Sequence, residues 1–348
     1  MIDAVLKQEI EELKARVEKV VLPPLLKEKV LDMIVRLGRV AKFGGYSSEY
    51  EKVTHYIEWV VTLPWDKETD DQVDLKQAQE ILNKHHYGME DIKERVLEHL
   101  AVLKLIRQKH AISRAPILCL VGLVGTGKTT LGPALAEVLG RQFARIPFGG
   151  MGSALDLRGQ SRLHPDAEPG QVIKALRRAK VKNPVIMLDE IDRMAQEARA
   201  DIMGVLIELL DPEQNAQFTD HFIDFPFDLS NVLFIATANN TTNISTAVLD
   251  RLEVLQMPSY NDEEKIAIGR DYVLPGAIQE HGLSPENLTI EDEVWPQIVR
   301  PLGFDGGIRT LERNIQAICR KVAKLIVEGK GQHFHLNKVN IKEFIPRW

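Results

Sequence analysis

One glycine-rich run in this chain has the residue types that hold phosphate groups. Gly122-Leu123-Val124-Gly125-Thr126-Gly127-Lys128-Thr129 fits the pattern G-x-x-x-x-G-K-[ST] at every fixed position. Glycines let successive backbone N–H groups curl around phosphate oxygens, and a helix that starts after them adds a positive partial charge. Lys128 can reach the β- and γ-phosphates, and Thr129 can offer its hydroxyl to Mg²⁺. The candidate nucleotide-binding residues of this run are Gly122, Gly125, Thr126, Gly127, Lys128, Thr129 and Thr130.

Polar side chains also follow two apolar runs further along the chain. The run Val185–Leu188 leads directly into the carboxylates Asp189 and Glu190. With a phosphate loop about 60 residues upstream, Asp189 suits the Mg²⁺ shell, and Glu190 suits a general base that orients the attacking water. The run 232–238 ends at Asn239, whose neutral side chain could position that water. Taken alone, Asn239 is better explained as a turn residue that starts the loop 239–242.

Elements of an α/β fold must position these groups. The runs 117–122, 185–188 and 232–238 are short, apolar and bounded by turn or charged residues, and helical patterns lie between them. Such alternation predicts a parallel sheet flanked by helices. The phosphate loop falls between a strand and a helix, which is the context its chemistry requires. Pro133, inside that helix, predicts a bend.

Helical patterns dominate both ends of the chain. Residues 1–65 read as helices separated at Pro23-Pro24 and near Gly44-Gly45, followed by a polar linker over 66–74. After Pro258, helical patterns over 262–273, 291–300 and 307–328 predict a helical small domain. We therefore predict an N-terminal helical region (1–65), an α/β nucleotide-binding domain (66–257) and a helical lid domain (258–348).

Composition narrows the function classes. Lys and Arg number 44 against 50 Asp and Glu, a net charge of −6, which argues against a protein that coats nucleic acid. No apolar run approaches the ~18 residues of a membrane helix, and the N-terminus does not resemble a signal peptide. Cys119 and Cys319 are too few and too far apart for a disulfide scaffold. These features favour a cytoplasmic protein.

Taken together, the motifs resemble the AAA+ ATPase module of Lon, the ATP-dependent protease. Besides the phosphate loop, the resemblance covers roughly residues 46–345 and rests on these ordered motifs: L-D-E-I-D at 188–192, L-L-D-P-E-Q-N at 209–215, F-I-A-T-A-N at 234–239, L-D-R-L-E-V at 249–254, H-Y-G at 86–88 and I-R-T-L-E-R at 308–313. It implies that Asn239 is sensor 1, that Arg309 is sensor 2, and that His86 and Tyr87 lie near the adenine. It also implies that Arg251 is an arginine finger acting on a neighbouring subunit's nucleotide, and hence a homo-oligomer, a hexameric ring.

The likeness is weaker at the pore loops. An aromatic–aliphatic pair usually grips the substrate polypeptide in this family, and His164-Pro165 takes its place here; Ala198 matches the bulky residue of the second loop. Large apolar side chains contribute ~1.5–3 kcal/mol each when buried, so these substitutes would grip weakly. The catalytic candidates are Glu190, Asn239, Arg251 and Arg309.

Several functions stay open. No serine–lysine peptidase segment is present, so we expect an ATP hydrolase that unfolds or translocates polypeptide for a separate protease domain or partner. A nucleotide-gated oligomeric scaffold or regulator is the main alternative, because the pore loops are polar. A P-loop GTPase or small-molecule kinase is disfavoured, because no N-K-x-D guanine signature occurs.

Overall fold

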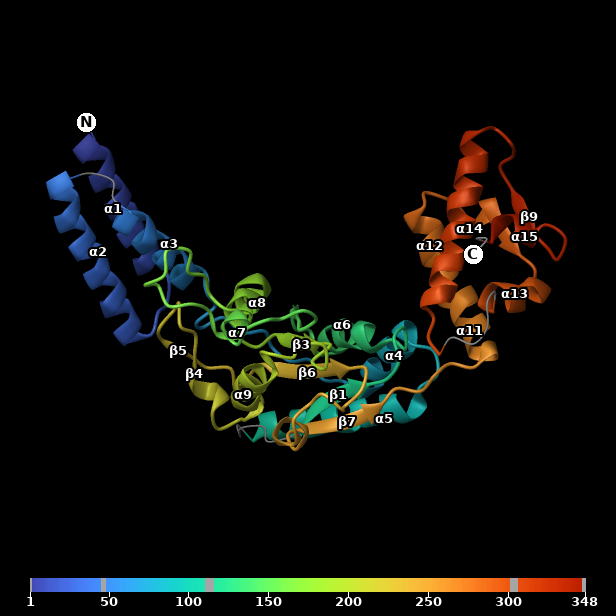
Figure 1. Ribbon diagram of the computed structural model, residues 1–348, viewed down its shortest axis with the longest axis horizontal. Helices are drawn as coiled ribbons and strands as arrows, with labels where there is room; N and C mark the ends of the chain where they lie inside the picture. Colours follow the sequence, from blue (N-terminus) through green and yellow to red (C-terminus); the bar gives the residue numbers. More distant parts are fainter. Residues whose placement is uncertain (1, 45–47, 110–115, 301–305, 346–348) are drawn as a thin grey trace. The chain divides into compact units, whose positions relative to one another are not determined.

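The computed structural model describes residues 2–44, 48–109, 116–300 and 306–345 (Figure 1). The chain divides into two compact units, each assembled from separate segments. The first, called here the sheet unit, consists of Met1–Leu75, Glu98–Leu120 and Gly132–Val254. The second, the lid unit, consists of Lys76–Leu97, Val121–Leu131 and Leu255–Trp348.

The N-terminal helices belong to the sheet unit. They are α1 (Ile2–Glu18), α2 (Pro24–Gly44) and α3 (Ser48–Thr62). Buried side chains recur at helical spacing, as Val30, Ile34 and Leu37 do on α2, so the helices pack through apolar faces. Pro24 is the first residue of α2, where a helix needs no backbone N–H, whereas α1 already ends at Glu18, before the proline pair. The predicted helices are confirmed; Gly45 lies outside the described residues.

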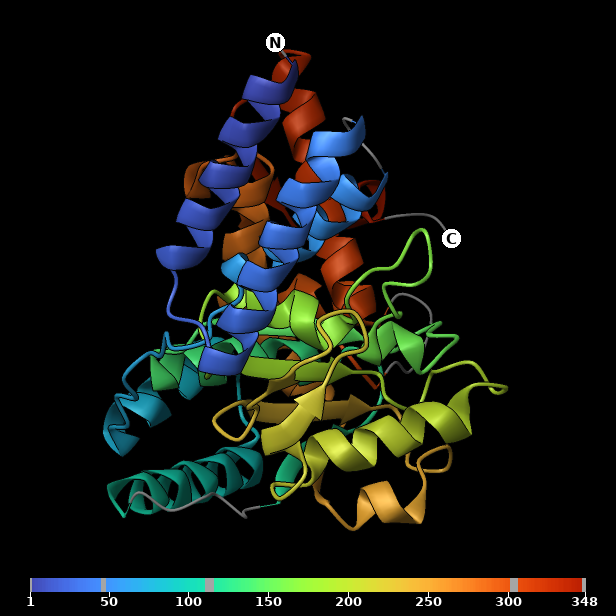
Figure 2. The same ribbon diagram turned by 90° about the vertical axis from the view of Figure 1, so that its left-hand side faces the viewer.

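Five strands in the order β2-β3-β6-β1-β7 form the sheet. Their bounds are β1 Ile117–Val121, β2 Phe143–Pro147, β3 Val185–Asp189, β6 Leu233–Ala238 and β7 Leu252–Gln256. Every residue of β3 is buried, and this strand pairs in parallel with β2 and β6. Helices flank the sheet (Figures 1 and 2), among them α5 (Glu90–Gln108), α8 (Gln171–Ala179) and α9 (Arg199–Leu210). The predicted α/β class is confirmed.

The sequence predicted β1, β3 and β6 but not β2 and β7, which are the outermost strands of the sheet. An edge strand has one neighbour, and residues of β2 alternate between buried and more exposed positions over Phe-Ala-Arg-Ile-Pro. A short alternating run gives a much weaker signal than a continuous apolar one, and β2 was missed for that reason.

Helix α6 (Lys128–Leu139) follows the glycine-rich loop and lies close to the sheet at Gly132. A Cβ added at Gly132 would lie 2.5 Å from Met187 Cε and 2.9 Å from a ring carbon of Phe143. Glycine therefore permits an approach to β2 and β3 that any side chain would prevent. Pro133 lies inside α6, and the helix continues to Leu139 without interruption.

A buried carboxylate ties two loops of the sheet unit together. Asp220, which is 1% exposed, follows β4 (Phe218–Thr219) and precedes β5 (Pro226–Phe227). Its oxygens accept hydrogen bonds from the backbone N–H groups of Gly170 (2.7 Å), Phe222 (2.8 Å) and Ile223 (3.0 Å). The Asp220 carboxylate therefore fixes the end of the loop that carries His164 and Pro165. Burial raises the pKa of Asp220 to about 6.

Asp220→Asn should remove a pH dependence of stability. The folded protein binds the Asp220 proton more tightly than the unfolded chain, whose carboxyl keeps its ordinary pKa of 3.8. The contribution of this group to the free energy of unfolding therefore grows by about 1 kcal/mol as the pH falls from 7 to 5, and is lost as the pH rises through 6. Urea denaturation of the wild type and of Asp220→Asn at pH 7 and pH 5 measures this change in the free energy of unfolding. An equal difference between the proteins at both pH values would contradict the raised pKa.

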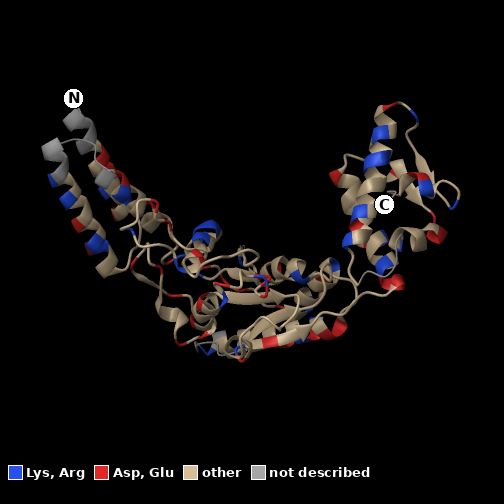
Figure 3. Ribbon diagram, in the orientation of Figure 1, with Lys and Arg blue, Asp and Glu red and all other residues tan. Residues whose placement is uncertain are grey.

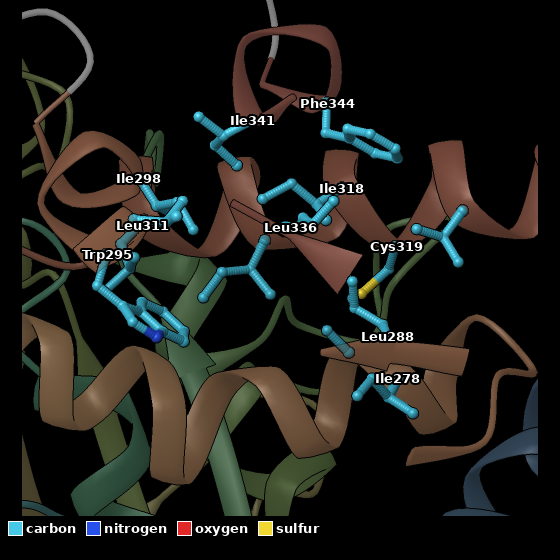
Figure 4. Close-up of a cluster of buried hydrophobic side chains, with 14 of the residues drawn as sticks. Ile278, Leu288, Trp295, Ile298, Leu311, Ile318, Cys319, Leu336, Ile341 and Phe344 are labelled. Carbon is cyan, nitrogen blue, oxygen red and sulfur yellow. The ribbon is translucent and has the colours of Figure 1, made fainter. Parts of the chain in front are cut away.

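The lid unit has an apolar core of its own. Its C-terminal part contains α11 Asp262–Ile268, a π-helical turn Gly269–Val273, α12 Leu274–Glu280, β8 Leu288–Ile290, α13 Trp295–Val299, α14 Arg309–Val327, β9 Phe334–Leu336 and α15 Ile341–Phe344. Figure 4 shows side chains from these elements, such as Trp295, Ile318 and Leu336, packed together. Asn261 caps α11 by accepting the N–H of Glu264, while Glu264 accepts that of Asn261. The predicted helical character is confirmed, with one short parallel pair, β8 and β9, added.

Candidate functional site

The glycine-rich loop lies in the lid unit and has the conformation that phosphate binding needs. Gly125 and Gly127 have φ angles of 83° and 86°, in the left-handed region that glycine adopts without strain. The Lys128 ammonium donates hydrogen bonds to the carbonyl oxygens of Gly122 (2.6 Å) and Leu123 (2.8 Å). Thr129, in the first turn of α6, is exposed. The loop thus places a buried ammonium group and an exposed threonine at the N-terminus of a helix.

The start of α14 contacts this loop within the lid unit. The Ile308 N–H donates to the Gly125 carbonyl oxygen at 3.1 Å. A Cβ on Gly307 would lie 2.1 Å from the Val124 carbonyl oxygen, so only glycine permits the approach. Arg309, the first residue of α14, is therefore held beside the phosphate loop with its side chain exposed. The structure brings together two motifs that the resemblance had linked.

A cavity of about 290 Å³ opens beside the same loop, and all of its lining residues belong to the lid unit. Its walls include His86, Tyr87, Gly127, Tyr272 and Ile308. The rings of Tyr87 and Tyr272 meet edge-on at 6.3 Å. The mixture of aromatic, aliphatic and polar walls, at a volume near the lower end for ligand pockets, suits a planar base. His86 and Tyr87 thus lie at a cavity that adjoins the phosphate loop.

His86 connects the cavity to the loop. Its Nε2 lies 2.9 Å from Thr130 Oγ1, and the Thr130 hydroxyl donates its one proton to the Gly127 carbonyl oxygen at 2.9 Å. Nε2 must therefore carry the imidazole proton, which leaves Nδ1 as an acceptor. Nδ1 is buried and has no hydrogen-bond partner among the described residues. Burial lowers the pKa of His86 to about 4, so the ring is neutral at pH 7.

In the sheet unit, Asp189 and Glu190 stand at the carboxyl end of β3. Asp189 is 2% exposed; its Oδ1 accepts the Thr237 hydroxyl at 2.5 Å, and its Oδ2 accepts Arg145 Nε at 2.7 Å. Thr237 Oγ1 also accepts the Glu190 N–H at 2.9 Å. One threonine of β6 therefore orients both acidic residues.

The backbone of Glu190 is held in an unusual conformation. Its φ is 57°, in the left-handed region that costs a non-glycine residue of the order of 1 kcal/mol. Hydrogen bonds on both sides fix it: Ile191 N–H donates to the Thr237 carbonyl oxygen (3.0 Å), and Arg193 N–H donates to the Glu190 carbonyl oxygen (2.9 Å). Strain maintained by its surroundings is typical of functional residues.

Thr237→Val should lower ATP turnover by about tenfold to a hundredfold without changing the shape of the site. Valine keeps the volume but removes the donor to Asp189 and the acceptor for the Glu190 N–H, so a buried N–H loses its partner. That loss costs about 1–3 kcal/mol, which also lowers the melting temperature. Steady-state ATPase assays and thermal unfolding measure the two effects. The matched control is Thr242→Val, in the exposed loop after β6. Unchanged turnover in Thr237→Val would exclude this role.

Asn239 follows β6 directly, and β6 is the neighbour of β3. The register pairs Leu188 with Ala236, so Asn239 stands at the same sheet edge as Asp189 and Glu190. The loops after the two strands are joined, because the Asn240 N–H donates to Asp192 Oδ2 at 3.3 Å. The three polar residues that the sequence singled out in this unit are therefore brought together.

Arg251, further along the sheet unit, is held by residues of its own chain. Its Nη2 lies 3.1 Å from Asp211 Oδ2, and its Nη1 donates to the Ala247 carbonyl oxygen at 2.8 Å. The backbone N–H of Glu213 and the Arg251 guanidinium hold the pKa of Asp211 below its usual range. The guanidinium is thus oriented before any partner binds, and about a third of the side chain remains exposed.

The loop that carries His164 and Pro165 is anchored at both ends to α3. The Arg162 guanidinium lies 4.0 Å above the Tyr56 ring, and Glu168 lies 3.2 Å from His55 Nε2. Between these anchors Leu163 is 90% exposed. His164 and Pro165 are exposed as well. Leu163 therefore supplies an apolar side chain beside the His164-Pro165 pair that the sequence analysis had singled out.

Ala198 differs from its neighbours. Its side chain is 7% exposed, whereas Gln196 and Glu197 before it are exposed. In this conformation the surface of the second loop is formed by those two polar side chains, and Ala198 packs inward at the start of α9.

Sequence reasoning missed Arg145, Thr237, Asp211 and Leu163. Arg145 and Thr237 both contact Asp189, and Asp211 contacts Arg251. In each case the two residues lie 40 to 48 positions apart in the sequence. Only the alignment of strand ends could have suggested them, and β2, which carries Arg145, had not been predicted. Leu163 could have been found as the apolar residue beside His164.

Two further findings concern the described residues as a whole. No cluster of three or more His, Cys, Asp or Glu side chains there could hold a metal ion unaided. Among those same residues, no helix combines the length and apolarity of a membrane span.

Comparison with known proteins relates this geometry to two families. Residues 118–260 match the ATPase family associated with various cellular activities (AAA), and residues 279–334 match the Lon protease AAA+ ATPase lid domain. The Lon protease of Desulforamulus reducens is 43% identical over 334 residues, 95% of this chain and 40% of that protein. Lon protease 1 of Bacillus subtilis is 42% identical over 339 residues, which are 97% of this chain and 43% of that protein. The chain spans about two fifths of the length of these curated relatives.

Proposed function

The chain belongs to the Lon protease family, whose AAA ATPase and lid segments it carries, and on that basis we propose that it binds ATP with Mg²⁺ and hydrolyses ATP to drive motions of a ring. The observation that carries the proposal is the phosphate loop itself. Two left-handed glycines and a buried lysine lie beside a base-sized cavity and beside the arginine that starts α14.

Binding would use main-chain N–H groups and one ammonium. The N–H groups of residues 125–130 and the Lys128 ammonium would hold the phosphates, in place of the carbonyl oxygens that Lys128 now contacts. The neutral His86 and Tyr87 would receive the base in the cavity.

The donor set fits a magnesium ion that arrives with the nucleotide. Thr129 and Asp189 would hold it together with phosphate oxygens and water, which are ligands that Mg²⁺ prefers. When bound, the ion would offset the charge of the phosphate groups.

Hydrolysis would depend on groups placed around the γ-phosphate. Glu190 would orient a water and accept its proton, and Asn239 would position that water. Arg309 would offset charge on the phosphate from the same subunit. Arg251 would do so on a neighbour's nucleotide, which requires a homo-oligomer, and we propose a hexameric ring. We also propose that the N-terminal helical region ends at residue 65 and that the α/β nucleotide-binding domain ends at residue 257.

The ring would act on polypeptide chains, and peptide-bond cleavage would belong to a separate or adjoining protease domain. Leu163, His164 and Pro165 are the exposed residues available to contact a chain. A single leucine provides less apolar area than an aromatic–aliphatic pair. Weak threading is therefore expected, and a nucleotide-gated scaffold is the second candidate, favoured by the polar surface of the loop around Ala198.

Steady-state ATPase assays with and without unfolded casein test the proposal. ATP hydrolysis that casein stimulates supports a translocating ATPase, and Leu163→Ser should then reduce the stimulation while the basal rate is unchanged. Hydrolysis that casein leaves unchanged supports the scaffold. Turnover of GTP in preference to ATP, or no nucleotide binding at all, would overturn the proposed function.

A further inference from the structure

Asp189 is already neutralised by a residue of its own sheet. Arg145 lies on β2, two positions before Pro147, which pairs with Asp189 in the parallel register. Its guanidinium reaches Asp189 Oδ2 through Nε at 2.7 Å and makes a second contact through Nη2. Both nitrogens contact the same carboxylate oxygen, so the pair is a charge-assisted hydrogen bond with a second guanidinium contact to that oxygen.

The rest of the surroundings leave Asp189 little capacity for a cation. Its other oxygen accepts the Thr237 hydroxyl, and its side chain is 3% exposed. Glu190, the next carboxylate, lies 3.5 Å from Arg193 Nη1. Each acidic residue thus faces an arginine, and the two carboxylates together present almost no net negative charge. Lys and Arg are frequent on neighbouring α8 as well (Figure 3), where Arg178 donates to the Arg145 carbonyl oxygen at 3.3 Å.

We propose that Arg145 is a positioning residue that keeps divalent cations away from Asp189 until a triphosphate is bound. The inference rests on the proposed function, in which Asp189 belongs to the Mg²⁺ shell. A dication near a neutralised carboxylate gains little attraction and is repelled by the guanidinium. The triphosphate brings several negative charges, which outweigh that repulsion, so the metal enters with the nucleotide and not before it.

The consequence is an order of binding. Without Arg145, the Asp189 carboxylate would lose its counter-ion and attract a free divalent ion at the carboxyl end of β3. With Arg145, the empty site stays free of metal at millimolar Mg²⁺. The Arg145 guanidinium also fixes the orientation of the Asp189 carboxylate, and with it the direction of the lone pairs that remain on its oxygens.

Binding of Mn²⁺, measured by the electron paramagnetic resonance signal of the free ion, tests the inference on the full chain. In nucleotide-free protein at 150 mM KCl, the wild type should show no site at this position below about 10 mM Mn²⁺, and adding ATP should create one, counted beyond the Mn²⁺ that the same ATP binds without protein. Arg145→Gln should gain one nucleotide-free site at least tenfold tighter, a change of at least 1.4 kcal/mol. Arg178→Gln, which removes an equal charge from the adjoining helix, should gain none.

A double variant assigns the new site. Arg145→Gln with Asp189→Asn should lose the gained ion, and Arg145→Lys, which keeps the charge, should behave like the wild type. A wild-type protein that binds one Mn²⁺ tightly without nucleotide overturns the inference whether or not the variants fold. So does an Arg145→Gln protein that folds and binds no more Mn²⁺ than the wild type. Failure of the proposed function would show separately, as absence of ATP-induced Mn²⁺ binding in the wild type.

Discussion

Glu190→Gln should retain ATP binding and lose turnover by a factor of about 10²–10⁴, the usual contribution of a general base. Glutamine keeps the size of the side chain and the left-handed backbone, which Thr237 and Arg193 hold through main-chain groups. It cannot accept a proton from water at neutral pH. The protein should therefore collect in its ATP-bound state.

Fluorescent-nucleotide binding and single-turnover hydrolysis separate the two effects in the Glu190→Gln protein. Glu197→Gln is the matched control, because Glu197 is exposed in the loop before α9 and should have no effect. Electron microscopy of the Glu190→Gln protein with ATP would also test whether the proposed ring forms. Normal turnover in Glu190→Gln would remove the proposed mechanism.

Lys128→Ala should weaken ATP binding by about a hundredfold or more. Lys128 is 7% exposed, and its ammonium contacts two loop carbonyl oxygens, so it is already positioned to meet phosphate oxygens. Truncating one partner of a buried charge pair costs about 2–5 kcal/mol, and each 1.4 kcal/mol is tenfold in affinity.

Isothermal titration calorimetry with ATP measures the loss in Lys128→Ala. Lys324→Ala is the control within the lid unit, because the Lys324 side chain is 72% exposed on α14 and pairs only at the surface with Glu328. Thermal unfolding of both variants checks that the loop change leaves the fold intact. Wild-type affinity in Lys128→Ala would mean that the glycine-rich loop holds no triphosphate.

The fold was predictable where a local pattern was strong. The continuous apolar runs of β1, β3 and β6 and the helical spacings at both ends correspond to observed elements. The edge strand β2 was not predictable, because its residues alternate and include Arg145. The same omission hid the contact between Arg145 and Asp189, which requires knowing that two strands 40 residues apart are neighbours.

The candidate site was predictable by residue type but not by interaction. Chemistry alone pointed to Lys128, Asp189 and Glu190, because each spacing has a mechanistic reason. The roles of Arg251 and Arg309 came only from resemblance, since single arginines after loops carry no signal of their own. The protonation of His86 depends on Thr130 donating to Gly127, a detail of geometry that no sequence pattern encodes.

The contacts between α3 and the loop at 162–168 bear on how this protein can be divided for study. A fragment that starts at residue 66 would leave Arg162 without the Tyr56 ring and Arg177 without the Trp59 ring, 4.1 Å away. It would also uncover Phe222, which lies against His55 and Tyr56. The N-terminal helices are thus an integral part of the sheet unit. A fragment without them would expose apolar surface and aggregate, so it would not serve as a minimal version of the protein.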